Sequence, residues 1–284
     1  MNATYTTFNA TIEGDPYAPF IYCFVSMGAL SALQVVLAIA FIVYYEAQWF
    51  NHFNMQLIGM GVSLVGNFVF NGLSYDEAWS SGGTDPITIL VSIGSNFFGG
   101  CPTVAYSLFA YQRGRAIIPP RQWLIQRLLL SAVVLQVSLN VLSAITGSLC
   151  WTVYFFNGDI RSLLVDISLY VTFVSYALLT VFDLFLLGLF FTRVRQTRLD
   201  GATTNEQFSI ICRYGIVAGL LCLLSTAFFL AYGEISDAPW INWLFFASCC
   251  CMYGVWCSQL AMKVDLMRLS NRVRSTSLEV SSRY

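Results

Sequence analysis

Residues 19–45 read PFIYCFVSMGALSALQVVLAIAFIVYY, an apolar run without a single Asp, Glu, Lys or Arg. A helix needs about 20 such residues to cross the hydrocarbon core of a bilayer. Hydrocarbon offers no partners to the backbone, and a helix satisfies its backbone hydrogen bonds within the segment. The stretch therefore predicts a transmembrane helix.

Six further runs of the same kind follow along the chain. Charged residues interrupt three of the seven runs: Arg127 and Arg213 lie near an end of theirs, and Asp166 and Asp183 lie in the fifth. The pattern predicts an all-α polytopic membrane protein, a seven-transmembrane helix bundle over residues 19–262. The six further runs span residues 55–73, 87–111, 123–149, 163–191, 210–232 and 240–262.

The composition excludes other classes of protein. The chain has 57% hydrophobic and 10% charged residues, whereas soluble domains carry about 25% charged residues. Its 14 Lys and Arg residues against 15 Asp and Glu residues leave no basic excess, so a nucleic-acid partner is not expected.

The basic residues predict the orientation in the membrane. Of the 14 Lys and Arg residues, all but Arg161 lie at or beside one face of the predicted bundle, and such a face is cytoplasmic. The tail 1–18 is then extracellular or luminal and the tail 263–284 is cytoplasmic. Asn2 and Asn9 each begin an Asn-Ala-Thr sequon, so both are glycosylation candidates on the outer side. We expect a multi-pass protein of the plasma membrane or an endomembrane.

Asp183 carries the largest free-energy cost of insertion into the membrane, because it is an acidic residue deep in the fifth run. An ionised carboxylate inside a membrane costs several kcal/mol. It is either a functional group, as an ion or proton site or as a polar lock between helices, or a structural group that holds the bundle. Ser175 and Thr180 of the same segment are candidates to lower the cost.

Asparagines add further polar groups to the spans. Asn67 and Asn71 are four residues apart, as are Gln136 and Asn140, so each pair shares one helix face. We expect these faces to point into the bundle and to form hydrogen bonds between helices. Either a water-filled polar core or simple inter-helix adhesion fits the pattern.

Two cysteines, Cys23 and Cys150, lie near the predicted outer boundary. An oxidising compartment permits a disulfide there, and two separate membrane thiols are the alternative.

The tail after residue 262 has the pattern of a short amphipathic helix. Met262, Leu266, Leu269 and Val273 form an apolar stripe, and neighbouring basic residues, Lys263 among them, suit anionic membrane lipid. Ser275 and Ser277 follow in a basic setting, either as phosphorylation sites or as part of an unmodified end.

No enzymatic chemistry is expected. His52 is the only histidine and Lys263 the only lysine, and neither lies deep in a span. Histidine-ligated metal or haem, a Ser-His dyad and a retinal Schiff base are therefore excluded at depth. We predict no catalytic residues, no metal and no cofactor.

The seven spans, the glycosylatable outer tail, the basic inner loops and the amphipathic tail together resemble a G-protein-coupled receptor. Residues 110–115, AYQRGR, are loosely similar to the Asp-Arg-Tyr segment of the rhodopsin-like class, with Arg113 in place of its arginine and Gln112 in place of its acid. The chain thus diverges from that class. The resemblance implies an unknown extracellular ligand and a heterotrimeric G protein as cytoplasmic partner. The residues expected to face that partner are Arg113, Arg115, Arg193, Arg195 and Arg198.

Two other functions stay open on the sequence. A small-solute or ion transporter or channel would use Asp183 and the buried asparagines as its pathway, and a non-signalling scaffold would use the spans for lateral contacts.

Overall fold

The computed structural model describes residues 18–46, 50–80, 86–118, 122–153, 158–199, 206–234 and 241–281. Each described range contains one helix that is long and apolar enough to cross a membrane. The seven-helix, all-α fold predicted from the sequence is confirmed, and the chain is a multi-pass membrane protein. The helices are α2 (Ala18–Tyr45), α3 (His52–Ser80), α4 (Pro86–Ile117), α5 (Trp123–Val153), α6 (Gly158–Leu199), α7 (Glu206–Glu234) and α8 (Ile241–Ser281).

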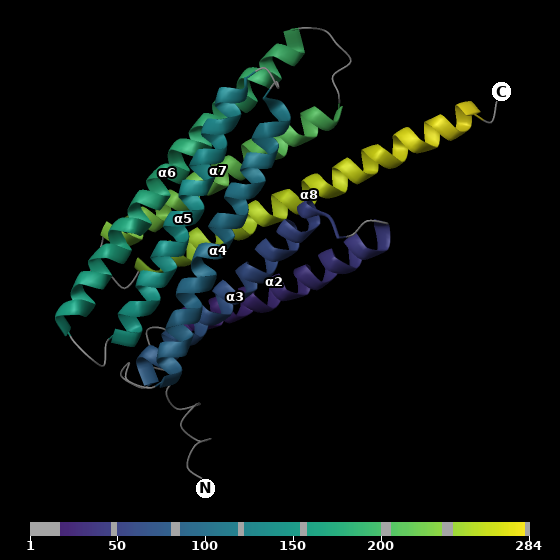
Figure 1. The fold of residues 1–284 in the computed structure, drawn as a ribbon. Coiled ribbons are helices and arrows are strands. Elements are labelled where there is room, and N and C mark those ends of the chain that lie inside the picture. Colours follow the sequence, from purple (N-terminus) through teal and green to yellow (C-terminus); the bar gives the residue numbers. More distant parts are fainter. Residues whose placement is uncertain are drawn as a thin grey trace, which may run out of the picture.

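The last helix differs from the sequence expectation. The tail beyond residue 262 is helical, as predicted, but it is not a separate element, because α8 runs unbroken to Ser281. Figure 1 shows α8 leaving the bundle as one straight helix. Residues 263–281 contain no Gly and no Pro, the residues that most often end a helix, so nothing local separates the tail from the span.

The helices pack in chain order, and α8 closes the arrangement by contacting α2 and α3. Helix α4 is central, since it contacts α3, α5, α6, α7 and α8. Helices α2 and α5 do not pack against each other. A group on α4 is therefore the best placed to connect the two sides of the bundle.

Side chains between the helices are buried, whereas those on the outer face of the bundle are exposed. Tyr106, Phe109 and Trp256 are fully buried between helices, and the Trp256 indole nitrogen donates a 2.9 Å hydrogen bond to the Leu57 carbonyl oxygen across α8 and α3. Large apolar side chains cover the outside, which suits contact with lipid tails. Examples of these exposed residues are Leu33, Val36, Val134, Tyr170 and Val181.

Candidate functional site

A polar cavity of about 260 Å³ lies inside the bundle, and six of the seven described helices line it. Its polar lining consists of amides and hydroxyls, and none of the described lining residues is an Asp, Glu, Lys or Arg. Such a lining offers hydrogen bonds but no counter-charge, so it suits a neutral polar guest. The polar lining residues are Asn67, Asn71, Ser95, Asn96, Thr103, Asn140, Ser143, Ser168, Thr172, Tyr176 and Ser248.

On one side of the cavity the two asparagines of α3 form a connected network. The Asn71 amide donates to the Asn67 side-chain oxygen at 2.6 Å and accepts from the Ser95 hydroxyl of α4 at 2.8 Å. The Asn67 amide in turn donates to the Cys249 sulfur of α8 at 3.5 Å. The predicted pairing of these asparagines on one face holds, and it links three helices.

On the other side, hydrogen bonds join α5 to α6. The amides of Gln136 and Asn140 donate to the Ser175 hydroxyl at 3.0 and 3.1 Å, and the hydroxyls of Ser143 and Thr172 lie 2.6 Å apart. Ser175 therefore accepts hydrogen bonds from the two α5 amides, and it is not the hydrogen-bond partner of Asp183 that the sequence suggested. The two networks fix the cavity walls, because a buried amide without a partner is costly.

A second polar group, the charged cluster of Tyr106, Arg113 and Asp183, lies on the side of the cavity toward the carboxyl end of α4. Tyr106 lies one turn beyond Thr103 on α4, and Asp183 lies two turns beyond Tyr176 on α6, about 10 Å along the axis. The Tyr106 hydroxyl donates to one Asp183 oxygen at 2.6 Å. Tyr106 and Asp183 are each 1% exposed.

Arg113 completes the charged cluster. It lies two turns after Tyr106 on the same face of α4, with its guanidinium carbon 5.9 Å from the Tyr106 ring centroid and 6.0 Å from that of Phe190. The second Asp183 oxygen and two guanidinium nitrogens, Nε and Nη1, have no hydrogen-bond partner. Buried groups left in this way are rare and costly, so the cluster is held in place by the packing around it.

The arginines expected to face a cytoplasmic partner differ in their exposure. Arg113 is 5% exposed, so in this conformation it does not face a partner on the surface as predicted. It lies seven residues after Tyr106, on the same helix face, and its side chain therefore packs over the Tyr106 ring. Arg115 and Arg195 are exposed. The side chains of Arg193 and Arg198 lie outside the described residues.

Lys263 also differs from expectation, because it contacts protein rather than lipid. It forms an ion pair with Glu46, just beyond α2, and its ammonium lies 5.2 Å from the Phe53 ring centroid of α3. The Asn54 amide donates to the same carboxylate. Partial burial raises the pKa of Glu46, but hydrogen bonds from Lys263 and Asn54 outweigh it and lower the pKa below the ordinary 4.5. We call Glu46, Asn54 and Lys263 the clasp.

No disulfide joins Cys23 and Cys150, both of which the structure describes. Cys23 lies on α2 and Cys150 on α5, and these helices do not pack together. The depth of each cysteine follows from its own segment, but its neighbours depend on how the helices pack, so the candidate disulfide is not formed here.

The remaining predicted modification sites are not tested by the geometry. Asn2 and Asn9 lie outside the described residues, and so do the side chains of Ser275 and Ser277, although their backbone belongs to α8.

Comparisons with protein-family models, with curated proteins and with solved structures find no match.

Sequence reasoning missed two partners of these groups. Tyr106 is the donor to Asp183, and Glu46 is the partner of Lys263. Both contacts join residues far apart in the chain. The signal available for Tyr106 was a tyrosine deep in an apolar run, since a buried phenol needs a hydrogen-bond partner.

Proposed function

We propose that the chain is a seven-helix receptor that passes a signal from the polar cavity to a partner in the cytoplasm, with a heterotrimeric G protein as the favoured partner. The amino end is outside and the carboxyl end inside, as the distribution of basic residues favours. The function is one of binding and conformational change, without an enzymatic step.

The observation that carries this proposal is the buried, under-satisfied charged cluster next to a polar cavity. A guest in the cavity would touch α4 at Thr103 and α6 at Tyr176, one turn from Tyr106 and two turns from Asp183. Moving either helix would alter the Tyr106–Asp183 hydrogen bond and the packing that buries Arg113. A signal needs a guest that binds two bundle states with different affinity. States with the Tyr106–Asp183 hydrogen bond formed and broken would be two such states.

The inner end of the bundle is suited to receive the movement. Arg115 on α4 and Arg195 on α6 are exposed there, one beyond Arg113 and the other beyond Asp183 in the chain. Separation of these helix ends would expose Arg113 beside the two surface arginines and complete a basic site for a cytoplasmic protein.

Nucleotide exchange on a panel of purified G proteins tests this proposal, with the receptor in nanodiscs. Asp183→Asn removes the charge that opposes Arg113, and it should raise ligand-independent exchange about fivefold or more, the usual size of an allosteric coupling. Arg113→Ala should abolish exchange. Asp166→Asn is the control, because Asp166 is an exposed acid on the same helix.

Unchanged exchange in Asp183→Asn and Arg113→Ala would overturn the receptor proposal. A transporter is the second candidate, because the unpaired Asp183 oxygen lies near a polar cavity in mid-bundle. It would give pH-dependent uptake of a neutral solute into proteoliposomes that Asp183→Asn abolishes and Asp166→Asn preserves. Crosslinked assemblies without either activity would favour a scaffold.

A further inference from the structure

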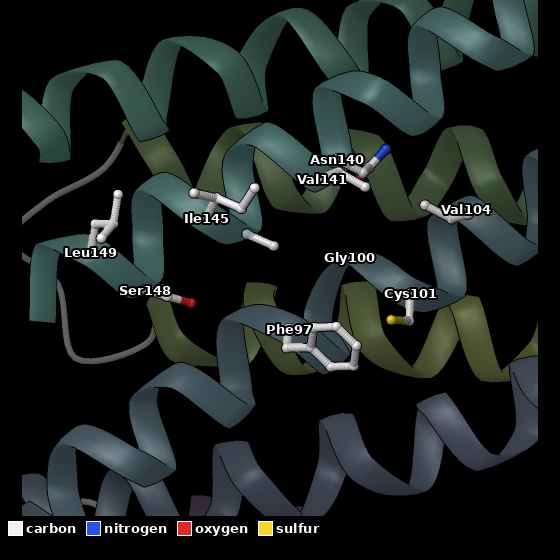
Figure 2. A pocket seen from close by; sticks show the side chains of 10 residues that line it. Phe97, Gly100, Cys101, Val104, Asn140, Val141, Ile145, Ser148 and Leu149 are labelled. Atoms are coloured by element: carbon white, nitrogen blue, oxygen red, sulfur yellow. The ribbon is translucent and has the colours of Figure 1, made fainter. Parts of the chain in front are cut away.

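An apolar groove of about 340 Å³ lies between α4 and α5 on the outside of the bundle. Figure 2 shows Phe97 and Cys101 on α4 and Ile145 on α5 around it. Phe97 is 56% exposed and Ile145 is 51% exposed, so the groove faces the region that lipid tails occupy. Its position runs from the middle of both helices toward the amino end of α4.

The groove and the polar cavity meet. Gly100, Asn140 and Ala144 line both of them. Two of these three residues have no side chain beyond a methyl group, so the wall between groove and cavity is thin. A Cβ atom built at Gly100 would come no closer to its neighbours than 3.6 Å, the distance to the Asn140 side-chain oxygen. A Cβ atom there would thus be in ordinary van der Waals contact with Asn140, which stands between the two spaces.

The two spaces differ in chemistry. The groove is lined mainly by apolar side chains, whereas the cavity presents amides and hydroxyls without a charged residue. Together they match a molecule with a hydrocarbon tail and a neutral head that forms hydrogen bonds. A charged head would enter the cavity without a counter-ion, and burying an unpaired charge is costly.

We propose that the groove and the cavity act as one site for a neutral single-chain amphiphile from the bilayer, of the monoacylglycerol type. Its tail lies in the α4–α5 groove, and its hydroxyl-bearing head passes the small residues at Gly100 and Ala144 into the polar cavity. That this amphiphile is also the receptor's signal rests on the proposed function. Its binding is measured without a G protein.

Photolabelling tests the binding. The probe is a monoacylglycerol with a diazirine and an alkyne in its acyl chain, added to the full chain in nanodiscs. Mass spectrometry should place the label on residues 97–104 and 141–149, and excess unlabelled monoacylglycerol should remove it. A fatty acid and a long-chain amine with the same tail should label these residues less.

Two variants enlarge side chains in the wall that the groove shares with the cavity. Gly100→Val and Ala144→Leu each displace two or three methylene groups of the tail. The concentration of unlabelled monoacylglycerol that is needed to remove the label should therefore rise about tenfold or more. Gly188→Val is the matched control, because a Cβ atom built at this exposed α6 glycine meets nothing within 4 Å. It should label as the wild type does. Size-exclusion profiles confirm that each variant is folded.

Equal labelling of the wild type, Gly100→Val and Ala144→Leu would overturn the inference, as would equal labelling of these segments by a headless diazirine alkane. Specific labelling without nucleotide exchange on any G protein would support the site and reject the receptor. Exchange that responds to Asp183→Asn without specific labelling would support the receptor and reject the amphiphile.

Discussion

At the scale of single residues, Asp183 shows how one contact decides whether a charge is tolerated in the membrane. The Tyr106 hydroxyl donates a 2.6 Å hydrogen bond to one oxygen of its carboxylate, and the Cys222 thiol of α7 is a second neighbour able to form a hydrogen bond. Breaking a buried pair of this kind leaves an uncompensated polar group, which costs about 1–3 kcal/mol. A residue held so weakly can change partners when its helix moves.

Small residues matter at this scale too, because they set how closely helices approach. Gly66 on α3 lies against the Phe98 ring of α4, and a Cβ atom built at Gly66 would come within 2.6 Å of ring atom Cγ and 2.8 Å of Cε1. A contact that short forces the helices apart or the ring out of place.

We expect Gly66→Ala to lower the free energy of unfolding by about 1–3 kcal/mol, the usual cost of overpacking. Gly59→Ala on the same helix is the control, because a Cβ atom there meets nothing within 4 Å, and it should leave stability unchanged or slightly raised. Thermal unfolding in detergent measures both. A Gly66→Ala protein as stable as Gly59→Ala would contradict the close packing of α3 on α4.

At the scale of helices, the clasp of Glu46, Asn54 and Lys263 ties the chain just beyond α2 to the start of α3 and to α8. Glu46 and Asn54 are only eight residues apart, whereas Lys263 is far from both in the sequence. Lys263 is the last buried residue on α8 among those described, and just beyond it the Tyr214 hydroxyl of α7 donates to Asp265 of α8 at 2.8 Å.

The clasp predicts a dependence of stability on pH. The pKa of Glu46 is lower in the folded protein than its ordinary 4.5, so its contribution is complete above that value and disappears as pH falls through the lowered pKa. Glu46→Gln should therefore be less stable than the wild type at neutral pH, and the two should converge in acid. Thermal unfolding from pH 7 to pH 3 measures this, and a constant difference across that range would refute the clasp.

At the scale of the whole molecule, the bundle has two ends of different character. The cavity and groove lie toward the amino end of α4, and the charged cluster and the clasp lie toward the opposite end. Under the proposed function, a conformational change would have to pass from the cavity to the basic end of the bundle. Helix α4 connects the two regions, because it contacts five other helices.

We expect the amino end outside and the carboxyl end in the cytoplasm. The wild type expressed in cells should carry a glycan that a glycosidase removes, and the double variant Asn2→Gln, Asn9→Gln should lose that mass shift. An epitope after residue 284 should be accessible only in permeabilised cells. Both ends accessible from one side would overturn this orientation and, with it, the receptor.

The sequence by itself determined the number of helices, their approximate bounds and the sorting of Asp183, Asn67, Asn71 and Asn140 into the membrane interior. These properties depend on the length and polarity of local segments, since hydrocarbon demands long apolar helices and penalises polar groups outside the bundle. Only the tertiary structure decided that Tyr106 donates a hydrogen bond to Asp183, that Glu46 pairs with Lys263 and that Arg113 is buried. It also decided that the α4–α5 groove and the polar cavity share a wall. Those outcomes depend on which helices become neighbours and at what rotation, and contacts between distant segments leave no periodic trace in a single sequence.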